Sequence, residues 1–522
     1  MITTSDSWKL IHKRPFLPET FVEISCGMTD VGINDLLEVR SEDEAVFSKA
    51  ENTIKSTGSL SFARYATLEH NLWVLDGSRN IIPDSGPYNT PGYVSGSSVP
   101  ASIVFSLPEV RATPVPGLTI TWSSEYGEYA VNFTVSAKNG DRVIAFTEVT
   151  GNTTTVTEVD MELVNYDSVV IEVTKWSLPD HRVRIERVAF GHVVVFNKSD
   201  ILSFSHEQHG CLNSGEIPKN RIEFTLDNTD GRWNPNNPTG IGKYLSERQQ
   251  ITVRYGLDVN GKTEWIPAGK WYLSEWSAPA NGLEAFFSAR DVFEFMLNEP
   301  YTGDSTGSLK HLLSEAFSVA DLPDDFVSNI DSSLGSYTAT LEGEHTVAEV
   351  VQLCANAGYC VLWQDRNGVL NIVPLNETYS GYSIESDLSY SHPEVTLSKP
   401  LKAVSVSYGE DSTYSLSVGT SGETQTVDNP LVDTIDQAEG MAAWVRHTME
   451  SRKSVSGEYR ANPSLDLFDV VTIESKYGII YPVAITNIKY TYSGSFRGTY
   501  TGKVINTEAV LGQFILGASL LE

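Results

Sequence analysis

Cysteine is scarce in this sequence, and long apolar runs are missing. The four cysteines, Cys26, Cys211, Cys354 and Cys360, are scattered without a C-x-x-C pair or a second cluster of metal ligands beside them. This spacing argues against a zinc site and favours buried free thiols over a disulfide. No stretch of about 20 apolar residues occurs, and the sequence does not open on a basic segment followed by an apolar run. We therefore expect a protein made in the cytoplasm without a membrane span.

Positive charge is scarce as well. The chain has 37 Lys and Arg against 67 Asp and Glu, a formal net charge of −30. Nucleic-acid binding depends on cationic side chains that displace counterions, so this balance argues against a protein that reads DNA sequence. A tube through which DNA passes would instead benefit from an acidic lining that does not hold the polymer. We keep that use as a hypothesis.

The length and the pattern of apolar residues indicate several β-rich domains. A chain of 522 residues exceeds what one core usually serves. Apolar and polar residues alternate with period two, for example at 251–255 and 404–408, which is typical of strands with one buried face. The expected fold class is mainly β with a minor α+β part. Helices are expected at about 308–320, 346–357 and 436–449.

The helix at 346–357 carries end signals of its own. Thr346 and Glu349 have the spacing of a capping box, and Gly358 is expected to end the helix in a left-handed conformation. A hairpin is expected to follow, with its turn at 364–368 and positive φ at Asn367 or Gly368.

Composition changes divide the chain into five segments. Residues 76–100 are rich in Gly, Pro, Ser and Asn, and evenly spaced strand patterns follow them up to residue 195. This is typical of a β-sandwich inserted into another domain. The predicted segments are a discontinuous β domain at 1–75 plus 198–295, the inserted sandwich at 76–197, an α+β domain at 296–395, a second β domain at 396–508 and an apolar tail at 509–522.

Three local motifs match known sites only in part. Residues 256–263 satisfy the P-loop pattern, but a strand-like, proline-containing segment follows where the phosphate-binding helix should begin, so we expect a hairpin turn at Asn260 and Gly261. His206 and His209 are three apart, which misses the zinc-protease spacing. Residues 227–231 lack the glycine position and the bidentate Glu of a calcium loop. No catalytic residue, cofactor or metal site is assigned, and we expect no enzyme.

The inserted sandwich offers one candidate recognition site. Its aromatic residues Trp122, Tyr126 and Tyr129 cluster at a strand junction, and Trp176 lies in a nearby loop. Exposed rings suit sugars, whose C–H groups pack on aromatic faces. The alternative is that these rings fill the core of the sandwich or a domain contact.

The β domains resemble hub proteins of phage and prophage tails, relatives of the trimeric baseplate hub of contractile-tailed phages. The resemblance is carried by a recurrent order of motifs and by a later segment with Phe468 where such hubs usually have Gly. The motifs are LDNTDGRWNP at 226–235, RQQITV at 248–253, IPAGKWYL at 266–273, ARD at 289–291 and YRANPSLDLFDVV at 459–471. The sandwich is similar to galactose-binding-like modules, chiefly at 183–191.

This resemblance implies two similar hub β-barrels per chain, so that three chains present six equivalent surfaces to a sixfold tube. It implies a virion tail tip or baseplate protein. The implied partners are two further copies of the chain, the tail tube or distal tail protein, spike, tape-measure or fibre proteins and cell-surface glycan. The apolar tail, with Phe514, Ile515, Leu516 and Leu520, is expected to dock on such a neighbour. The alternatives are a carbohydrate-binding surface protein and, third, a glycoside or peptidoglycan hydrolase.

Overall fold

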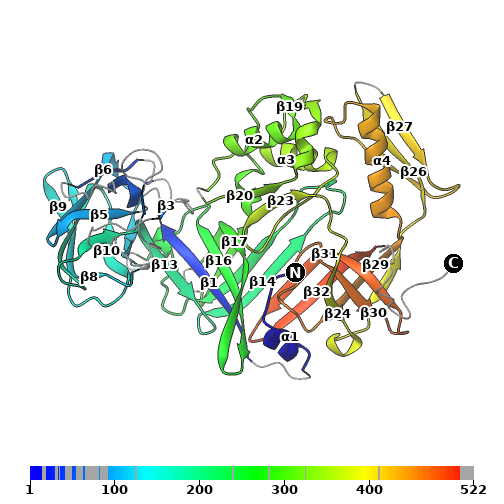
Figure 1. The fold of residues 1–522 in the computed structure, drawn as a ribbon. Coiled ribbons are helices and arrows are strands. Elements are labelled where there is room, and N and C mark those ends of the chain that lie inside the picture. The colour runs from blue at the N-terminus through cyan, green and yellow to red at the C-terminus, as the bar shows by residue number, and fades with distance from the viewer. Residues whose placement is uncertain are drawn as a thin grey trace. The chain divides into compact units, whose positions relative to one another are not determined.

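The computed structural model describes most of the chain and separates it into two compact units. The described residues are 1–14, 19–29, 33, 36–41, 50–53, 63–64, 81–82, 92–123, 126–237, 240–279, 282–323, 325–409 and 412–505. The first unit consists of Met1–Ser25, Val195–Asp230 and Gln250–Glu522, and the second of Cys26–Val194 and Gly231–Gln249. Figure 1 shows the elements of each unit.

The second unit is a β-sandwich. One sheet has the order β2-β6-β11-β8-β9, and β10, β7 and β13 pair in that order opposite it. One apolar core contains residues of both sheets. The bounds are β2 Glu38–Arg40, β6 Ala101–Arg111, β11 Tyr166–Trp176, β8 Ala130–Asn139, β9 Arg142–Val149, β10 Val156–Leu163, β7 Val115–Thr121 and β13 Arg187–Phe196. Smaller elements are η2 Ala50–Thr53, β3 Ala63–Arg64, β4 Ile81–Ile82, β5 Tyr93–Ser98, β12 Arg182–Ile185 and η3 Gly242–Tyr244.

The sandwich begins earlier in the chain than the composition indicated. Strand β2 pairs with β6 through Val39 and Phe105, and both side chains are buried in the sandwich core. The predicted start at residue 76 is therefore wrong, because strand pairing and shared burial, not the Gly- and Pro-rich segment, set the boundary. Residues 231–249, which the sequence placed in the discontinuous β domain, also belong to the second unit.

The first unit is built on one long, mainly antiparallel sheet. Its strands run in the order β1-β16-β17-β18-β15-β14-β31-β32-β29-β25, and β30 pairs with β31 and β24. The bounds are β1 Thr20–Thr29, β14 Ile201–His209, β15 Arg221–Asp227, β16 Gln250–Val259, β17 Lys262–Ser277, β18 Glu284–Arg290, β24 Tyr379–Ile384, β25 Glu394–Leu397, β29 Lys453–Tyr459, β30 Val470–Glu474, β31 Ile480–Tyr492 and β32 Phe496–Val504. The short helices α1 Asp6–His12, η4 Val292–Phe295 and η6 Ser386–Leu388 accompany it.

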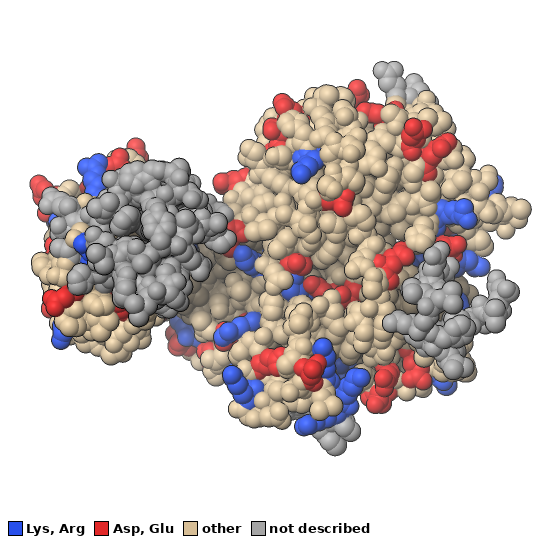
Figure 2. Space-filling model, in the orientation of Figure 1, with Lys and Arg blue, Asp and Glu red and all other residues tan. Residues whose placement is uncertain are grey.

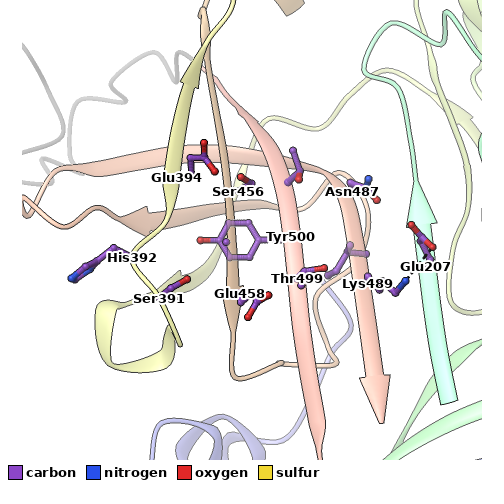
Figure 3. A pocket seen from close by; sticks show the side chains of 13 residues that line it. Glu207, Ser391, His392, Glu394, Ser456, Glu458, Asn487, Lys489, Thr499 and Tyr500 are labelled. Atoms are coloured by element: carbon purple, nitrogen blue, oxygen red, sulfur yellow. Dashed lines mark ion pairs between the residues drawn. The ribbon is translucent and has the colours of Figure 1, made fainter. Parts of the chain in front are cut away.

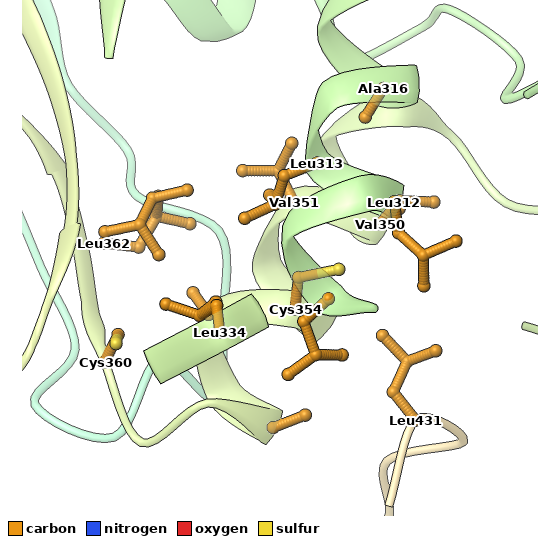
Figure 4. Close-up of a cluster of buried hydrophobic side chains, with 14 of the residues drawn as sticks. Leu312, Leu313, Ala316, Leu334, Val350, Val351, Cys354, Cys360, Leu362 and Leu431 are labelled. Atoms are coloured by element: carbon orange, nitrogen blue, oxygen red, sulfur yellow. The ribbon is translucent and has the colours of Figure 1, made fainter. Parts of the chain in front are cut away.

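An α/β part of the first unit has its own core. Helices α2 and α3 pack on each other, and Figure 4 shows Leu313 of α2 and Val351 of α3 pointing into the same cluster as Leu362 of β22. The bounds are β19 Thr306–Ser308, α2 Leu309–Val319, β20 Val327–Ile330, η5 Ser332–Ser336, β21 Thr338–Thr340, α3 Val347–Ala357, β22 Val361–Gln364 and β23 Val369–Val373.

Part of the predicted second β domain belongs to this α/β core. Strands β26 (Leu401–Tyr408), β27 (Ser412–Ser417) and β28 (Glu423–Val427) form a separate sheet. Helix α4 (Ile435–Met449) lies along β26 and β27 (Figure 1). Their buried side chains, Val404 and Val406 among them, join the cluster of α2 and α3. The predicted boundary at residue 396 is wrong for these elements, because their apolar faces turn towards the helices.

The predicted helix starts are confirmed, and one predicted helix end is wrong. Thr346 and Glu349 form the capping box of α3, and Ser308 caps α2 with its side chain. Gly358 has φ −93° and is not left-handed. The left-handed residue is the next one, Tyr359, at φ 58°, whose hydroxyl donates to Gln437 O at 2.8 Å. A tertiary contact thus holds a conformation for which the sequence pattern expected glycine. The hairpin turn after β22 has positive φ at Gly368, as predicted.

A buried arginine joins the α/β part to the long sheet. Arg366, in the turn between β22 and β23, is buried, and its Nη1 and Nη2 donate to Pro463 O at 2.8 Å and Leu465 O at 2.5 Å. Its Nε lies 3.4 Å from Asp466 Oδ1. The guanidinium carbon is 5.0 Å from the ring centre of Tyr490, within cation–π range.

Arg366→Leu is expected to lower the free energy of unfolding by about 3–5 kcal/mol, because it leaves Asp466 and two carbonyl groups buried without their cation. Urea unfolding followed by tryptophan fluorescence measures the change. Arg446→Leu, an exposed position on α4, is the control and should change stability little. Equal midpoints for wild type and Arg366→Leu would contradict a structural role for this cation.

The ARD motif at 289–291 lies where β18 ends and η4 begins. Asp291 caps η4 through Phe293 N–H at 3.2 Å and accepts a hydrogen bond from Asn220 Nδ2 at 2.7 Å. Burial raises the pKa of Asp291 to about 7, although both hydrogen bonds act in the opposite direction.

Between about pH 4 and pH 7 the folded chain therefore holds a proton on Asp291 that the unfolded chain has lost, so stability falls as pH rises through this window. Asp291→Asn keeps a capping side chain and cannot titrate. Its stability relative to wild type should rise across the window by about 1.4 kcal/mol per pH unit at most. Unfolding midpoints from pH 4 to pH 8 measure this difference.

Asp331→Asn is the matched control. Asp331 also caps a short helix, η5, but hydrogen bonds from Ser333 lower the pKa of Asp331. The contribution of Asp331 is complete above about pH 4 and is lost only below it, so the stability difference between Asp331→Asn and wild type should stay flat from pH 4 to pH 8. Parallel profiles for Asp291→Asn and wild type would refute the assignment.

Candidate functional site

Two groups of five strands in the long sheet share one topology. The first group has the sheet order β14-β15-β18-β17-β16 and the second the order β25-β29-β32-β31-β30. In both groups the strands, numbered along the chain, stand in the order 1-2-5-4-3, and every neighbouring pair is antiparallel.

The pairing register matches as well. One row of paired residues crosses the five strands of the first group, and a corresponding row crosses the second. The rows are Glu207, Arg221, Arg290, Tyr272 and Gln250 in the first group, and Thr396, Ser454, Lys503, Ala484 and Val470 in the second. These rows give a residue-by-residue correspondence between the groups.

Both groups carry the same irregularity at corresponding positions. The register shifts between Leu273 and Glu275 in β17, and between Ile485 and Asn487 in β31. The extra residues, Ser274 and Thr486, donate side-chain hydrogen bonds to Ser288 O at 3.1 Å and Thr501 O at 3.3 Å. A β-bulge with the same side-chain bond in the same place is a specific feature, and it indicates that the two groups are built alike.

The connection before the third strand of each group also corresponds. Arg248 and Phe468, each two residues before that strand, have φ 63° and φ 62°. Phe468, which stands where tail hubs usually have Gly, therefore adopts the same left-handed turn conformation as Arg248, although a bulky residue in this conformation is strained. Space for the ring comes from Gly210, where a Cβ atom would lie 2.5 Å from Phe468 Cζ.

The two groups form one continuous sheet. The second half of β31 pairs antiparallel with β14, with Glu207 opposite Lys489 and His206 opposite Tyr490. The first half of β31 pairs with β30. One strand of the second group therefore covers the outer strand of the first.

One face of this sheet is polar and has a hollow of about 410 Å³. Figure 3 shows Glu207, Lys489, Thr499 and Glu458 side by side across β14, β31, β32 and β29. Lys489 Nζ lies 3.6 Å from a Glu207 carboxylate oxygen, and Arg221 donates to the same carboxylate at 3.3 Å. Lys489 and Arg221 thus neutralise Glu207, and the hollow is open to solvent, so this face is a solvent-exposed polar surface and not an enclosed reaction site. Figure 2 shows acidic and basic side chains interspersed over the described surface of this view.

Two of the four predicted sugar-binding rings are buried. Trp122 is 0% exposed and its Nε1 donates to Thr157 Oγ1 at 2.9 Å, while Trp176 is 5% exposed. The alternative stated for these rings therefore holds for both tryptophans: they pack edge to face, 6.0 Å apart, in the sandwich core. Tyr126 and Tyr129 are partly exposed, and a sugar-binding role stays a prediction for them.

A charged cluster beside these rings was missed. Glu128 is 3% exposed and accepts hydrogen bonds from Trp176 Nε1 at 2.7 Å and from His181 Nδ1 at 3.1 Å. The guanidinium of Arg184 lies 4.2 Å from the centre of the Tyr126 ring. The alternating pattern at 182–185 indicated a strand, but nothing in the sequence indicated that Glu128 and Arg184 turn inward.

The three motifs that match known sites only in part are ordinary turns and strand residues of the fold. The P-loop match is the hairpin of β16 and β17, with Asn260 and Gly261 at φ 57° and 84°. Asp227 accepts a hydrogen bond from Thr229 N–H at 3.0 Å in an ordinary turn. His206 is buried in β14 with Nδ1 2.6 Å from the Tyr255 hydroxyl.

The remaining predictions concern the cysteines, the apolar tail and membrane-spanning helices. All four cysteines are free, as predicted, and Cys26, Cys354 and Cys360 are buried. Phe514, Ile515, Leu516 and Leu520 lie outside the described residues. Within the described part of the chain, no helix is long and apolar enough to span a membrane.

A group that sequence reasoning missed could hold a metal ion. Ligand atoms of Asp304, His311 and Glu315 lie within 4.8 Å of one another. His311 Nε2 and Asp304 Oδ2 already form a hydrogen bond at the surface, 3.0 Å long, which accounts for the arrangement without a metal.

No model of a known protein family matches the chain, and a search of curated proteins finds no relative. Among solved structures, the 43 kDa tail protein of prophage MuSo2 from Shewanella oneidensis is similar at 12% identity, over 60% of this chain and 95% of that one, with a TM-score of 0.41. The tail protein of Neisseria meningitidis MC58 is similar at 11% identity, over 60% and 94%, with a TM-score of 0.44.

A chitosan-binding module from a Paenibacillus chitosanase/glucanase is similar at 11% identity over 32% of this chain and 98% of that one, with a TM-score of 0.21. The chain is thus similar in fold to these two tail proteins over about three fifths of its length.

Proposed function

We propose that the chain is a structural subunit of a phage-type tail tip or baseplate, which forms a ring with two further copies and joins the tail tube to the spike or fibres. The observation that carries this proposal is the repeated five-strand group with its matching register and bulge. Three chains with two such groups each present six equivalent surfaces, as a sixfold tube requires.

The buried ionisable groups support a structural role over a catalytic one. Arg366 and Asp466 bond to each other and to backbone groups of the connection at 460–469. Asp291 caps a helix and accepts from Asn220. Each group stabilises the fold and is turned away from solvent, so none of them is placed to act on a bound substrate.

The polar face of the long sheet suits the wall of a passage. Glu207 is paired with Lys489, whereas Glu394 and Glu458 add negative charge, and neighbouring residues such as Thr499 and Ser456 are short and neutral. The excess of acidic residues over the whole chain disfavours tight contact with an anionic polymer such as DNA. We assign this face to the inside of the proposed ring.

Purified protein alone is expected to form trimers, with three times the mass of the chain by light scattering, and the mixture with the cognate tail-tube protein is expected to give a complex that contains three copies of the chain. Large interfaces of this kind should make the trimer fraction rise with concentration. A chain that stays monomeric at every concentration, with and without the tube protein, would contradict the ring.

The sandwich is proposed to bind a cell-surface glycan or a neighbouring tip protein. Support comes from the partly exposed rings of Tyr126 and Tyr129, which lie beside polar groups that include His181 and Arg184. Polar side chains next to an aromatic face suit the hydroxyl groups and C–H groups of a sugar. If no sugar binds, the same rings are expected to contact protein.

Tyr126→Ala with Tyr129→Ala is expected to weaken glycan binding about tenfold or more, through lost ring contacts. Glycan-array binding followed by titration of the best ligand measures the effect. Phe146→Ala removes a 61% exposed ring of β9 elsewhere on the sandwich and is the control. Unchanged affinity in the tyrosine variant would remove the sugar role.

A further inference from the structure

Strand β25 is the exposed counterpart of a covered strand. Through the matching rows, Val395 and Leu397 correspond to His206 and Gln208 of β14. His206 and Gln208 are 0% and 2% exposed because β31 pairs with β14 on its outer side. Val395 and Leu397 are 36% and 65% exposed, since the described residues pair β25 with β29 alone.

The end of β17 is the open counterpart of the strand segment that covers β14. Residues 487–489 of β31, which pair with β14, correspond to residues 275–277 of β17. Strand β16 begins opposite Tyr272, so among the described strands residues 275–277 pair with β18 on one side only. Trp276 takes the place of Ile488, which is 1% exposed, and Trp276 itself is partly exposed.

We propose that β25 of one copy pairs antiparallel with residues 275–278 of β17 in the next copy, in the register of the β14–β31 junction. This inference rests on the proposed function and identifies the interface that closes the ring. The register places Leu397 opposite Trp276 and Thr396 opposite Ser277, as Gln208 is opposite Ile488 and Glu207 opposite Lys489.

The chemistry of the two edges favours a second copy as the occupant. β25 is a short edge strand that begins with Glu394 and follows Pro393, as protected edges often do, yet the face that corresponds to the buried side of β14 carries the exposed Val395 and Leu397. The proposed pairing places Leu397 against Trp276, so that two apolar side chains cover each other. Because one chain has both the donor edge and the acceptor edge, copies join head to tail. Such a contact closes into a ring when each group repeats the rotation of the intrachain junction.

A disulfide can trap this register. The variant Leu397→Cys with Trp276→Cys, in a Cys211→Ser background that removes the one cysteine not fully buried, places two thiols opposite each other on neighbouring strands. Mild oxidation followed by non-reducing electrophoresis is expected to give covalent dimers and trimers, and nothing larger. The single variants, Leu397→Cys or Trp276→Cys alone, should remain uncrosslinked.

A charged residue introduced into β25 tests the same contact without a covalent crosslink. Leu397→Lys is expected to weaken trimer association at least tenfold, measured by light scattering across a dilution series. Leu283→Lys is the matched control, because Leu283 is also 65% exposed but lies just before β18 on neither edge. Far-UV circular dichroism confirms that both variants are folded.

The outcomes separate this inference from the function on which it rests. If the double-cysteine variant forms trimers without crosslinks, and trimers also form with Leu397→Lys, the proposed strand pairing is refuted but the trimeric ring still stands. A chain that is monomeric under all conditions overturns both. Crosslinking that appears only after removal of residues 506–522 would make that segment the occupant of β25 and overturn the proposed partner.

Discussion

The geometry of the first unit depends on one buried guanidinium. Arg366 comes from a hairpin turn of the α/β part, bonds to two carbonyl groups of the connection at 460–469 and lies 5.7 Å and 5.0 Å from the rings of Tyr255 and Tyr490. Tyr255 belongs to the first five-strand group and Tyr490 to the second. Burying a cation is costly unless its hydrogen bonds are satisfied, so this site favours one arrangement of three elements over near alternatives. Burial and the charge of Arg366 also lower the pKa of His206 well below its ordinary value, which keeps that ring neutral beside Tyr255.

Arg366 stabilises a sheet in which one strand, β31, pairs with two different strands on the same side. β31 pairs with β30 along its first half and with β14 along its second, and the bulge at Thr486 lies between the two parts. The same bulge at Ser274 in β17 has no structural need within the described residues of the first group, because residues 275–277 meet no strand beyond it. Its presence is explained if that segment also receives a partner.

Local order was predictable from residue patterns, whereas the repeat was expected only through the resemblance to tail hubs. The capping box of α3, the hairpin at Asn260 and the sandwich strands follow from short-range patterns, and the structure confirms them. The repeat is carried by backbone register, while corresponding side chains differ: Arg248 matches Phe468, and His206 matches Val395. Burial of Trp122 and Trp176 depends on the opposite sheet, and the left-handed Tyr359 depends on a contact with α4. Such long-range determinants leave no local pattern in the sequence.

The difference between corresponding residues has a physical reason. The β14–β31 junction forms as the chain folds, so a polar residue such as His206 is accommodated there, with its Nδ1 in a hydrogen bond to the Tyr255 hydroxyl. A junction between chains must leave the separate chain soluble and still gain free energy on association. Val395 and Leu397 meet both needs, since two exposed apolar residues are tolerated on a monomer and release their hydration when they meet Trp276. The two junctions therefore share a register and differ in chemistry, as expected when one is made by folding and the other by assembly.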